Sequence, residues 1–133
     1  MTRALRGLAA ALFLLLPLGA LAAPFAYVAN GSDDSVSVVD VATGTIVATV
    51  ALPPGSAPAG IAVNPVLPRA YVVNTGTNTL SVIDTATNTI VATTVLGNGA
   101  VVPTASPDGT RLYIPNFIDN TISIVETSTN AIV

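Results

Sequence analysis

The sequence predicts an all-β fold in which similar four-stranded antiparallel sheets repeat along the chain. Three observations lead to this prediction. Blocks rich in Val, Ile, Tyr and Thr recur at a nearly constant spacing, residues that favour turns separate the blocks, and apolar or small side chains occupy both faces of each predicted strand. The order of the elements along the chain supports each point.

The N-terminal segment has the layout of a secretory signal. Arg3 and Arg6 precede an apolar run over Gly7–Ala23, which is shorter than the roughly 20 residues of a comfortable membrane span. Ala20-Leu21-Ala22 supplies a small-x-small cleavage pattern. We therefore predict a helical signal peptide over 1–22 and no stable membrane span after its removal, with an uncleaved anchor as the alternative. The chain is expected to be exported to the periplasm, the extracellular space or the cell surface.

The composition of the remaining chain restricts its chemistry. Removing the signal leaves two arginines against seven acidic residues, a net charge of −5, which excludes nucleic acid as an expected partner because a phosphate backbone needs a basic face. The chain has no histidine and no cysteine, so it lacks the usual zinc ligands and the parts of a Ser-His-Asp or Cys-His arrangement. We therefore predict no catalytic residues, no metal, no cofactor and no enzymatic activity.

The first strand of each repeat is a tyrosine-containing block. Tyr27-Val28-Ala29-Asn30 returns as Tyr71-Val72-Val73-Asn74 and as Tyr113-Ile114-Pro115-Asn116, at spacings of 44 and 42 residues. A period of about 40 to 45 residues is typical of propeller blades. We expect the three tyrosines to pack in the core, within a partial propeller over 23–133. The predicted repeats lie near 26–69, 70–111 and 112–133.

Two further blocks keep the same register and predict two more strands. The second block ends in an acid: Ser37-Val38-Val39-Asp40, Ser81-Val82-Ile83-Asp84 and Ser123-Ile124-Val125-Glu126. The third block is rich in threonine and β-branched residues: Thr45-Ile46-Val47-Ala48-Thr49, Thr89-Ile90-Val91-Ala92-Thr93 and Ala131-Ile132-Val133. Alternation places Leu80 and Val82 on one face and Ile83 on the other, as expected for strands enclosed between neighbouring sheets.

Turn residues fall at equivalent places in every repeat. All six tolerate a positive φ, so one left-handed turn geometry fits each set. These residues are Gly44, Asn88 and Asn130 after the second block, and Asp34, Asn78 and Asn120 after the first. The acids that end the second block are expected to accept hydrogen bonds from backbone N–H groups of the following turn.

A fourth strand per repeat is predicted from two shorter segments. Gly60–Asn64 leads through two prolines into Arg69, and its counterpart Pro103–Ser106 is followed by the hairpin sequence Pro107-Asp108-Gly109. The first repeat begins directly with the Tyr27 block and has no such segment before it. In a closed ring, the end of the chain would supply that strand.

These blocks resemble the YVTN family of β-propeller repeats, found in surface-layer and periplasmic proteins. The resemblance covers 23–133 and also includes the segment Ser106–Tyr113. It implies blades of four antiparallel strands that commonly close into a ring of about seven, and it brings no shared catalytic set. Pro115 and the pair Phe117-Ile118 depart from the other copies, which have Gly31-Ser32 and Thr75-Gly76 in place of the apolar pair.

About two and a half repeats are present, fewer than the roughly four blades of the smallest propellers. We therefore interpret the chain as the N-terminal fragment of a longer protein, with self-assembly of short chains into a ring as the alternative. Unpaired blade edges are expected to permit self-association.

The loops between the first and second blocks carry the predicted contact surface, because a propeller gathers such loops on one rim. The candidates are Asp33, Asp34, Asn78, Phe117, Ile118, Asp119 and Asn120. Packing beneath a neighbouring blade is the alternative for Phe117 and Ile118. Oxygen ligands suit calcium, but the spacing of a calcium loop is absent, so we expect ordinary turn chemistry at the acids.

Three hypotheses of function follow from these expectations. The leading hypothesis is a non-catalytic binding or scaffold module whose ligand is an unidentified protein or small molecule. The alternative is an enzyme, such as a lactonase-like hydrolase, with most of its site in blades outside this sequence. The short self-assembling blade module is the third hypothesis.

Overall fold

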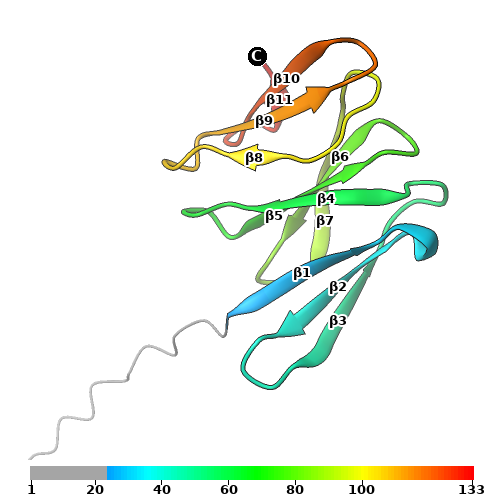
Figure 1. Cartoon of the computed structure of the whole chain (residues 1–133). Coiled ribbons are helices and arrows are strands. Elements are labelled where there is room, and N and C mark those ends of the chain that lie inside the picture. The colour runs from blue at the N-terminus through cyan, green and yellow to red at the C-terminus, as the bar shows by residue number, and fades with distance from the viewer. Residues whose placement is uncertain (1–23) are drawn as a thin grey trace, which may run out of the picture.

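The computed structural model describes residues 24–133, which form three antiparallel sheets that follow one another as propeller blades (Figure 1). Blade 1 contains β1 (Phe25–Asn30), β2 (Ser35–Asp40) and β3 (Thr45–Ala51). Blade 2 contains β4 (Pro58–Val63), β5 (Arg69–Asn74), β6 (Thr79–Asp84) and β7 (Thr89–Val95). Blade 3 contains β8 (Thr104–Ala105), β9 (Arg111–Asn116), β10 (Thr121–Glu126) and β11 (Ala131–Ile132). The predicted all-β blade architecture is confirmed, while the predicted signal peptide over 1–22 lies outside the described residues.

Each blade is a meander in which consecutive strands are neighbours. Blade 1 has three strands, in agreement with the missing first strand of its repeat. The first strand of blade 3, β8, is short because Pro103 and Pro107 bracket it and cannot donate to a sheet ladder. A single 3₁₀ turn, η1 (Gly31–Asp33), joins β1 to β2. No helix within 24–133 is long and apolar enough to cross a membrane.

The register repeats from blade to blade. The tyrosine of each first block pairs with the same position of the second block: Tyr27 with Val38, Tyr71 with Val82 and Tyr113 with Ile124. The predicted turn residues all have positive φ, from 48° at Asp34 to 68° at Gly44. The sequence blocks therefore correspond to strands and turns of one repeated unit.

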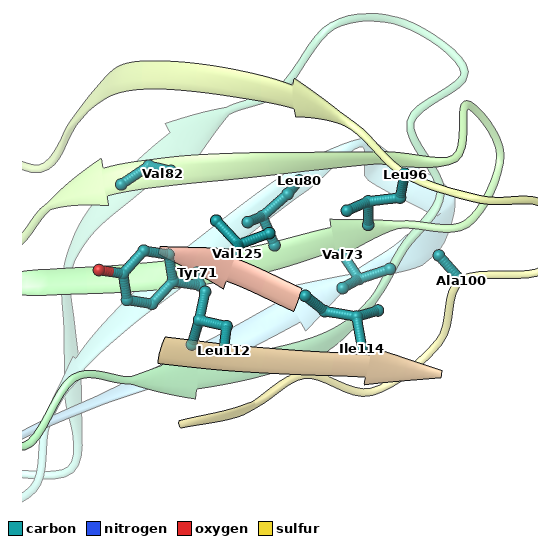
Figure 2. Close-up of a cluster of buried hydrophobic side chains, with 9 residues drawn as sticks. All are labelled: Tyr71, Val73, Leu80, Val82, Leu96, Ala100, Leu112, Ile114 and Val125. Carbon is teal, nitrogen blue, oxygen red and sulfur yellow. The ribbon is translucent and has the colours of Figure 1, made fainter. Parts of the chain in front are cut away.

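Apolar side chains from two blades meet between the sheets. Tyr71 and Val73 of β5 face blade 3, whereas Ala70 and Val72 on the opposite face pack against blade 1. Figure 2 shows the cluster between blades 2 and 3, in which Tyr71 lies beside Leu112. Full burial of one large aliphatic side chain stabilises a fold by about 1.5–3 kcal/mol, so these contacts join the sheets into a stack.

The equivalent tyrosines differ in burial. Tyr71 is fully buried and Tyr27 is partly buried, but Tyr113 is 39% exposed. Core packing is thus confirmed at Tyr71, while the expectation for Tyr113 is wrong within the described residues. The ring of Tyr71 is covered by blade 3, and no described sheet lies over the same face of blade 3.

The asparagine that ends each tyrosine block has a constant structural role. Its Nδ2 donates to two hydroxyl groups on the next strand, at 3.1 and 2.9 Å for Asn30, 3.0 and 2.8 Å for Asn74, and 3.1 and 2.9 Å for Asn116. The bonds tie the end of one strand to the start of the next. This explains why both the asparagine and the serine recur at the period of the blade.

Candidate functional site

The direction of the strands gathers the loops on two rims. The first rim contains the loops 31–34, 75–78 and 117–120 and the connections 52–57 and 96–103. The second rim contains the loops 41–44, 64–68, 85–88, 106–110 and 127–130. All seven predicted contact residues lie on the first rim, where three of them are engaged in fixing the loops.

Asp34 fastens the connection between blades 1 and 2. Its Oδ1 accepts a hydrogen bond from the Ala57 N–H at 2.8 Å, and its Oδ2 accepts one from the Gly55 N–H at 2.7 Å. These backbone donors, Ala57 first and Gly55 second, lower the pKa of Asp34 below its ordinary value. The carboxylate is therefore directed at the chain itself.

Asn78 and Asp119 fasten the connection between blades 2 and 3. Asn78 Oδ1 accepts from the Gly99 N–H at 3.0 Å. Asp119 accepts from the side-chain Nδ2 of Asn98 at 3.0 Å and from the Asn98 N–H at 2.7 Å, and these bonds lower the pKa of Asp119. The loop 117–120 is thereby held at a fixed place on the rim.

The other four predicted residues do not fasten a blade connection by a side-chain hydrogen bond, although Phe117 and Ile118 each have one side-chain atom close to Gly99. Within 24–133, Asp33 and Asn120 make no side-chain hydrogen bond. Phe117 and Ile118 are 65% and 63% exposed, so the alternative that they pack beneath a neighbouring blade is not what the described residues show. The loop backbone below them is fixed, since the Phe117 N–H donates to the Gly99 carbonyl at 3.1 Å.

The second rim carries a pocket of about 380 Å³ between blades 2 and 3. Val66 and Leu67, from the loop between β4 and β5, form an apolar wall. Blade 3 contributes Gly109 and five residues with polar or charged side chains: Asp108, Thr110, Glu126, Thr127 and Ser128. This volume lies within the roughly 300–1,000 Å³ of small-molecule sites.

A buried polar network forms the base of this pocket. Asn64 Nδ2 donates to the Gly109 carbonyl at 2.8 Å, and Thr127 Oγ1 donates to the same carbonyl at 2.7 Å. Asn64 Oδ1 accepts from the Val66 and Leu67 N–H groups, both at 2.9 Å. The hydrogen bond from Asn64 to Gly109 thus connects blade 2 to blade 3 next to the apolar wall.

Asp108 is a fixed anion at the edge of the pocket. Its Oδ1 accepts from the Ser106 hydroxyl at 2.6 Å, from the Thr110 N–H at 3.0 Å and from the Thr110 hydroxyl at 2.8 Å. These donors, the Ser106 hydroxyl first, lower the pKa of Asp108 to about 2. The carboxylate therefore stays ionised at neutral pH.

Glu126 differs from its equivalents in the other blades. Asp40 Oδ1 and Asp84 Oδ1 each accept two backbone N–H groups of the following turn, at 2.8 and 3.2 Å. Glu126 makes no such bond within 24–133, so the expectation of a turn-capping role is wrong at this position. The side chain of glutamate is one methylene longer than that of aspartate, and Glu126 is among the residues that line the pocket.

The arginine partner of this acid also differs between blades. Arg69 Nη1 donates to Asp84 Oδ2 at 2.6 Å, where the two residues pair across β5 and β6. Arg111 and Glu126 are paired in the same register in blade 3, yet they form no ion pair in the described structure. The Glu126 carboxylate is thus without a described partner.

Sequence reasoning singled out the first rim and missed the second-rim pocket. The available indication was the glutamate at a position where both other repeats have aspartate. Within 24–133, no group of three or more His, Cys, Asp or Glu side chains is placed to hold a metal ion. The arrangement of the pocket supports recognition of charge next to an apolar wall.

No family model matches the chain. No curated protein matches it either. Among solved structures, hydrazine synthase of Kuenenia stuttgartiensis is similar at 26% identity and a TM-score of 0.76, over 82% of this chain and 31% of that one. The dihydro-heme d1 dehydrogenase NirN is similar at 17% identity and a TM-score of 0.68, over 82% of this chain and 23% of that one. A putative 6-phosphogluconolactonase from Bacteroides fragilis is similar at 21% identity and a TM-score of 0.69, over 82% and 34%.

These comparisons support the fold and correct one expectation. The neighbours are β-propeller proteins, and this chain spans about a third of their length or less. They include enzymes, among them a dehydrogenase and hydrazine synthase, which contradicts the expectation of no enzymatic activity. Absence of histidine and cysteine from one set of blades is not a sound basis for that expectation, because a propeller can carry reacting groups on any blade. The chain is built of β-propeller blades.

Proposed function

We propose that the chain supplies blades of an exported YVTN-type propeller that binds a protein partner through the loop 117–120. The observation that carries this proposal is the pairing of a fixed loop backbone with two largely exposed apolar side chains. Phe117 and Ile118 are exposed on the first rim, while Asp119 and the Phe117 N–H hold the loop in place.

Preorganisation favours binding at this loop. A loop that is already held in one conformation loses little entropy when a partner docks. Aromatic and aliphatic side chains that insert into a partner's pocket supply most of the free energy of many interfaces. Phe117 and Ile118 are exposed on this loop, so we expect the partner to supply the complementary surface.

The other two blades lack this feature. Ser32 and Thr75 are polar, and the glycines beside them lie close to the blade connections. A Cβ atom added to Gly76 would collide with the Gly55 carbonyl oxygen, and one added to Gly31 would meet the Pro58 carbonyl oxygen at 3.2 Å. The apolar pair is therefore specific to blade 3 and is not a requirement of the repeat.

A comparative pull-down tests the proposal. The full chain, its Phe117→Ser/Ile118→Ser double variant and a Val95→Thr control are immobilised and exposed to the same extract of exported proteins. Val95 is 72% exposed at the end of β7, so the control removes an exposed apolar side chain that lies outside the loop 117–120. The proposal expects a protein that the original chain and the control retain and that the double variant loses. Equal retention by all three, or no retained protein, would contradict it.

A lactonase-like activity is the second candidate, favoured by the enzymes among the structural neighbours. The described pocket has two carboxylates and no lysine or arginine in its lining, so its charge disfavours a phosphorylated lactone. A neutral lactone is therefore the suitable test substrate. Hydrolysis of δ-valerolactone above the buffer rate, reduced by Glu126→Gln, would support this candidate, and a rate equal to buffer would exclude it for this substrate.

A further inference from the structure

We infer that the second-rim pocket between blades 2 and 3 binds a small organic cation that has an apolar body. This inference does not depend on the protein-binding loop, which lies on the opposite rim. It rests on the shape of the pocket, on the chemistry of its two walls and on the missing partner of Glu126.

The pocket has room for a small molecule and a stable frame. Its volume of about 380 Å³ suits a ligand of modest size. The base is held by the buried Asn64 and Thr127, which both donate to the Gly109 carbonyl. The Asn64 bond links blade 2 to blade 3, and the Thr127 bond fixes the Gly109 turn within blade 3.

The two walls differ in chemistry. Val66 and Leu67 offer exposed aliphatic surface on the side of blade 2. Asp108 and Glu126 place carboxylates on the side of blade 3, with the Ser128 residue beside them. A ligand with a cationic group at one end and a hydrocarbon or aryl body at the other matches both walls at once.

The charge on the blade 3 wall is available to a ligand. Asp108 already accepts three hydrogen bonds within its own turn, so it contributes a fixed negative charge. Glu126 neither caps its turn nor pairs with Arg111, so its oxygens are free to accept hydrogen bonds from an ammonium or guanidinium group. Arg69, the other arginine of the described segment, is held by Asp84.

Binding of 2-phenylethylammonium chloride tests the inference, with 2-phenylethanol as a neutral analogue and 3-phenylpropanoate as an anion. The full chain is titrated with each compound while its backbone amide NMR signals are followed. Saturable shifts are expected at Gly109, Thr110 and Ser128 for the ammonium compound. Hydrogen bonds to charged groups contribute about 1.5–3 kcal/mol, so the neutral analogue should bind at least about tenfold more weakly and the anion should not bind.

Three variants localise the interaction. Glu126→Gln keeps the shape of the side chain but removes its charge, and it should weaken binding of the ammonium compound about tenfold. Val66→Ser should also weaken it by removing part of the apolar wall. Asp33→Asn removes an equal charge from the opposite rim and should leave the affinity unchanged. Unperturbed amide spectra of the free variants establish that each remains folded.

Several results would overturn the inference. Equal affinity for the ammonium compound and the alcohol would show that charge plays no part. An equal loss in Glu126→Gln and Asp33→Asn would show that only the net charge of the chain matters. Shifts confined to the loop 117–120, or no saturable shift, would place the binding elsewhere or exclude it.

Discussion

Leu80 provides the sharpest test of packing between the blades. It is fully buried on the face of β6 that contacts blade 3, in the cluster with Tyr71 and Leu112. Leu80→Ala removes three carbon groups, each of which contributes about 0.8 kcal/mol when buried. The cavity left behind adds to this loss, and substitutions of this kind cost about 2–5 kcal/mol in total.

The chain contains a matched control at the same repeat position. Ile122 is the equivalent of Leu80 in blade 3, but it is 64% exposed. Ile122→Ala should change the free energy of unfolding by about 0.5 kcal/mol or less, as exposed substitutions usually do. Leu80 and Ile122 occupy equivalent positions of equivalent strands, so a difference between the two variants reports the difference in burial.

Equilibrium unfolding in urea measures both effects, with the midpoint followed by circular dichroism. The account expects a large fall in the midpoint for Leu80→Ala at an unchanged slope, and a nearly unchanged midpoint for Ile122→Ala. Equal and small effects would refute the reasoning, because Leu80 would then not be enclosed between two sheets. Equal and large effects would show that a surface left open in the described structure is covered in solution.

The remaining predictions concern the turn at the pocket. The fold lowers the pKa of Asp108 from 3.8 to about 2, so the stability that its carboxylate contributes is present above pH 3.8 and is lost as the pH falls toward about 2. Asp108→Asn should therefore flatten the acid side of a plot of melting temperature against pH. An unchanged plot would contradict this. Gly109 has φ +72°, and an added Cβ would collide with Asn64 Oδ1, whereas Gly44 has φ +68° and nothing within 4 Å. Both alanine variants incur the left-handed strain of about 1–3 kcal/mol. Gly109→Ala should lower the melting temperature further than Gly44→Ala, because only Gly109 has Asn64 in the way of the added Cβ. Equal melting temperatures would argue against the Asn64 contact.

The repeated elements were predictable because each depends on local chemistry. Asp34, Asn78 and Asn120 all adopt positive φ, since short polar side chains tolerate that conformation better than others. The fourth strand was predicted at Gly60–Asn64 and lies at Pro58–Val63. Its counterpart was predicted at Pro103–Ser106 and is only two residues long, Thr104–Ala105.

The pocket was not predictable because it depends on the spacing between blades. Val66 and Asp108 are 42 positions apart and meet only once blades 2 and 3 are packed. The sequence makes Glu126 equivalent to Asp40 and Asp84, because an acid recurs at that place in every repeat. One additional methylene is enough to remove its carboxylate from the turn, and this effect appears only when the hydrogen bonds of all three turns are compared.

Neighbouring blades bury their apolar faces against one another. Nuclear Overhauser contacts from the ring protons of Tyr71 test this packing most directly, because this residue lies on blade 2 and faces blade 3 (Figure 2). We expect contacts from the Tyr71 ring to methyl groups of Leu112 and other blade 3 residues. Contacts restricted to residues of blade 2 would contradict it.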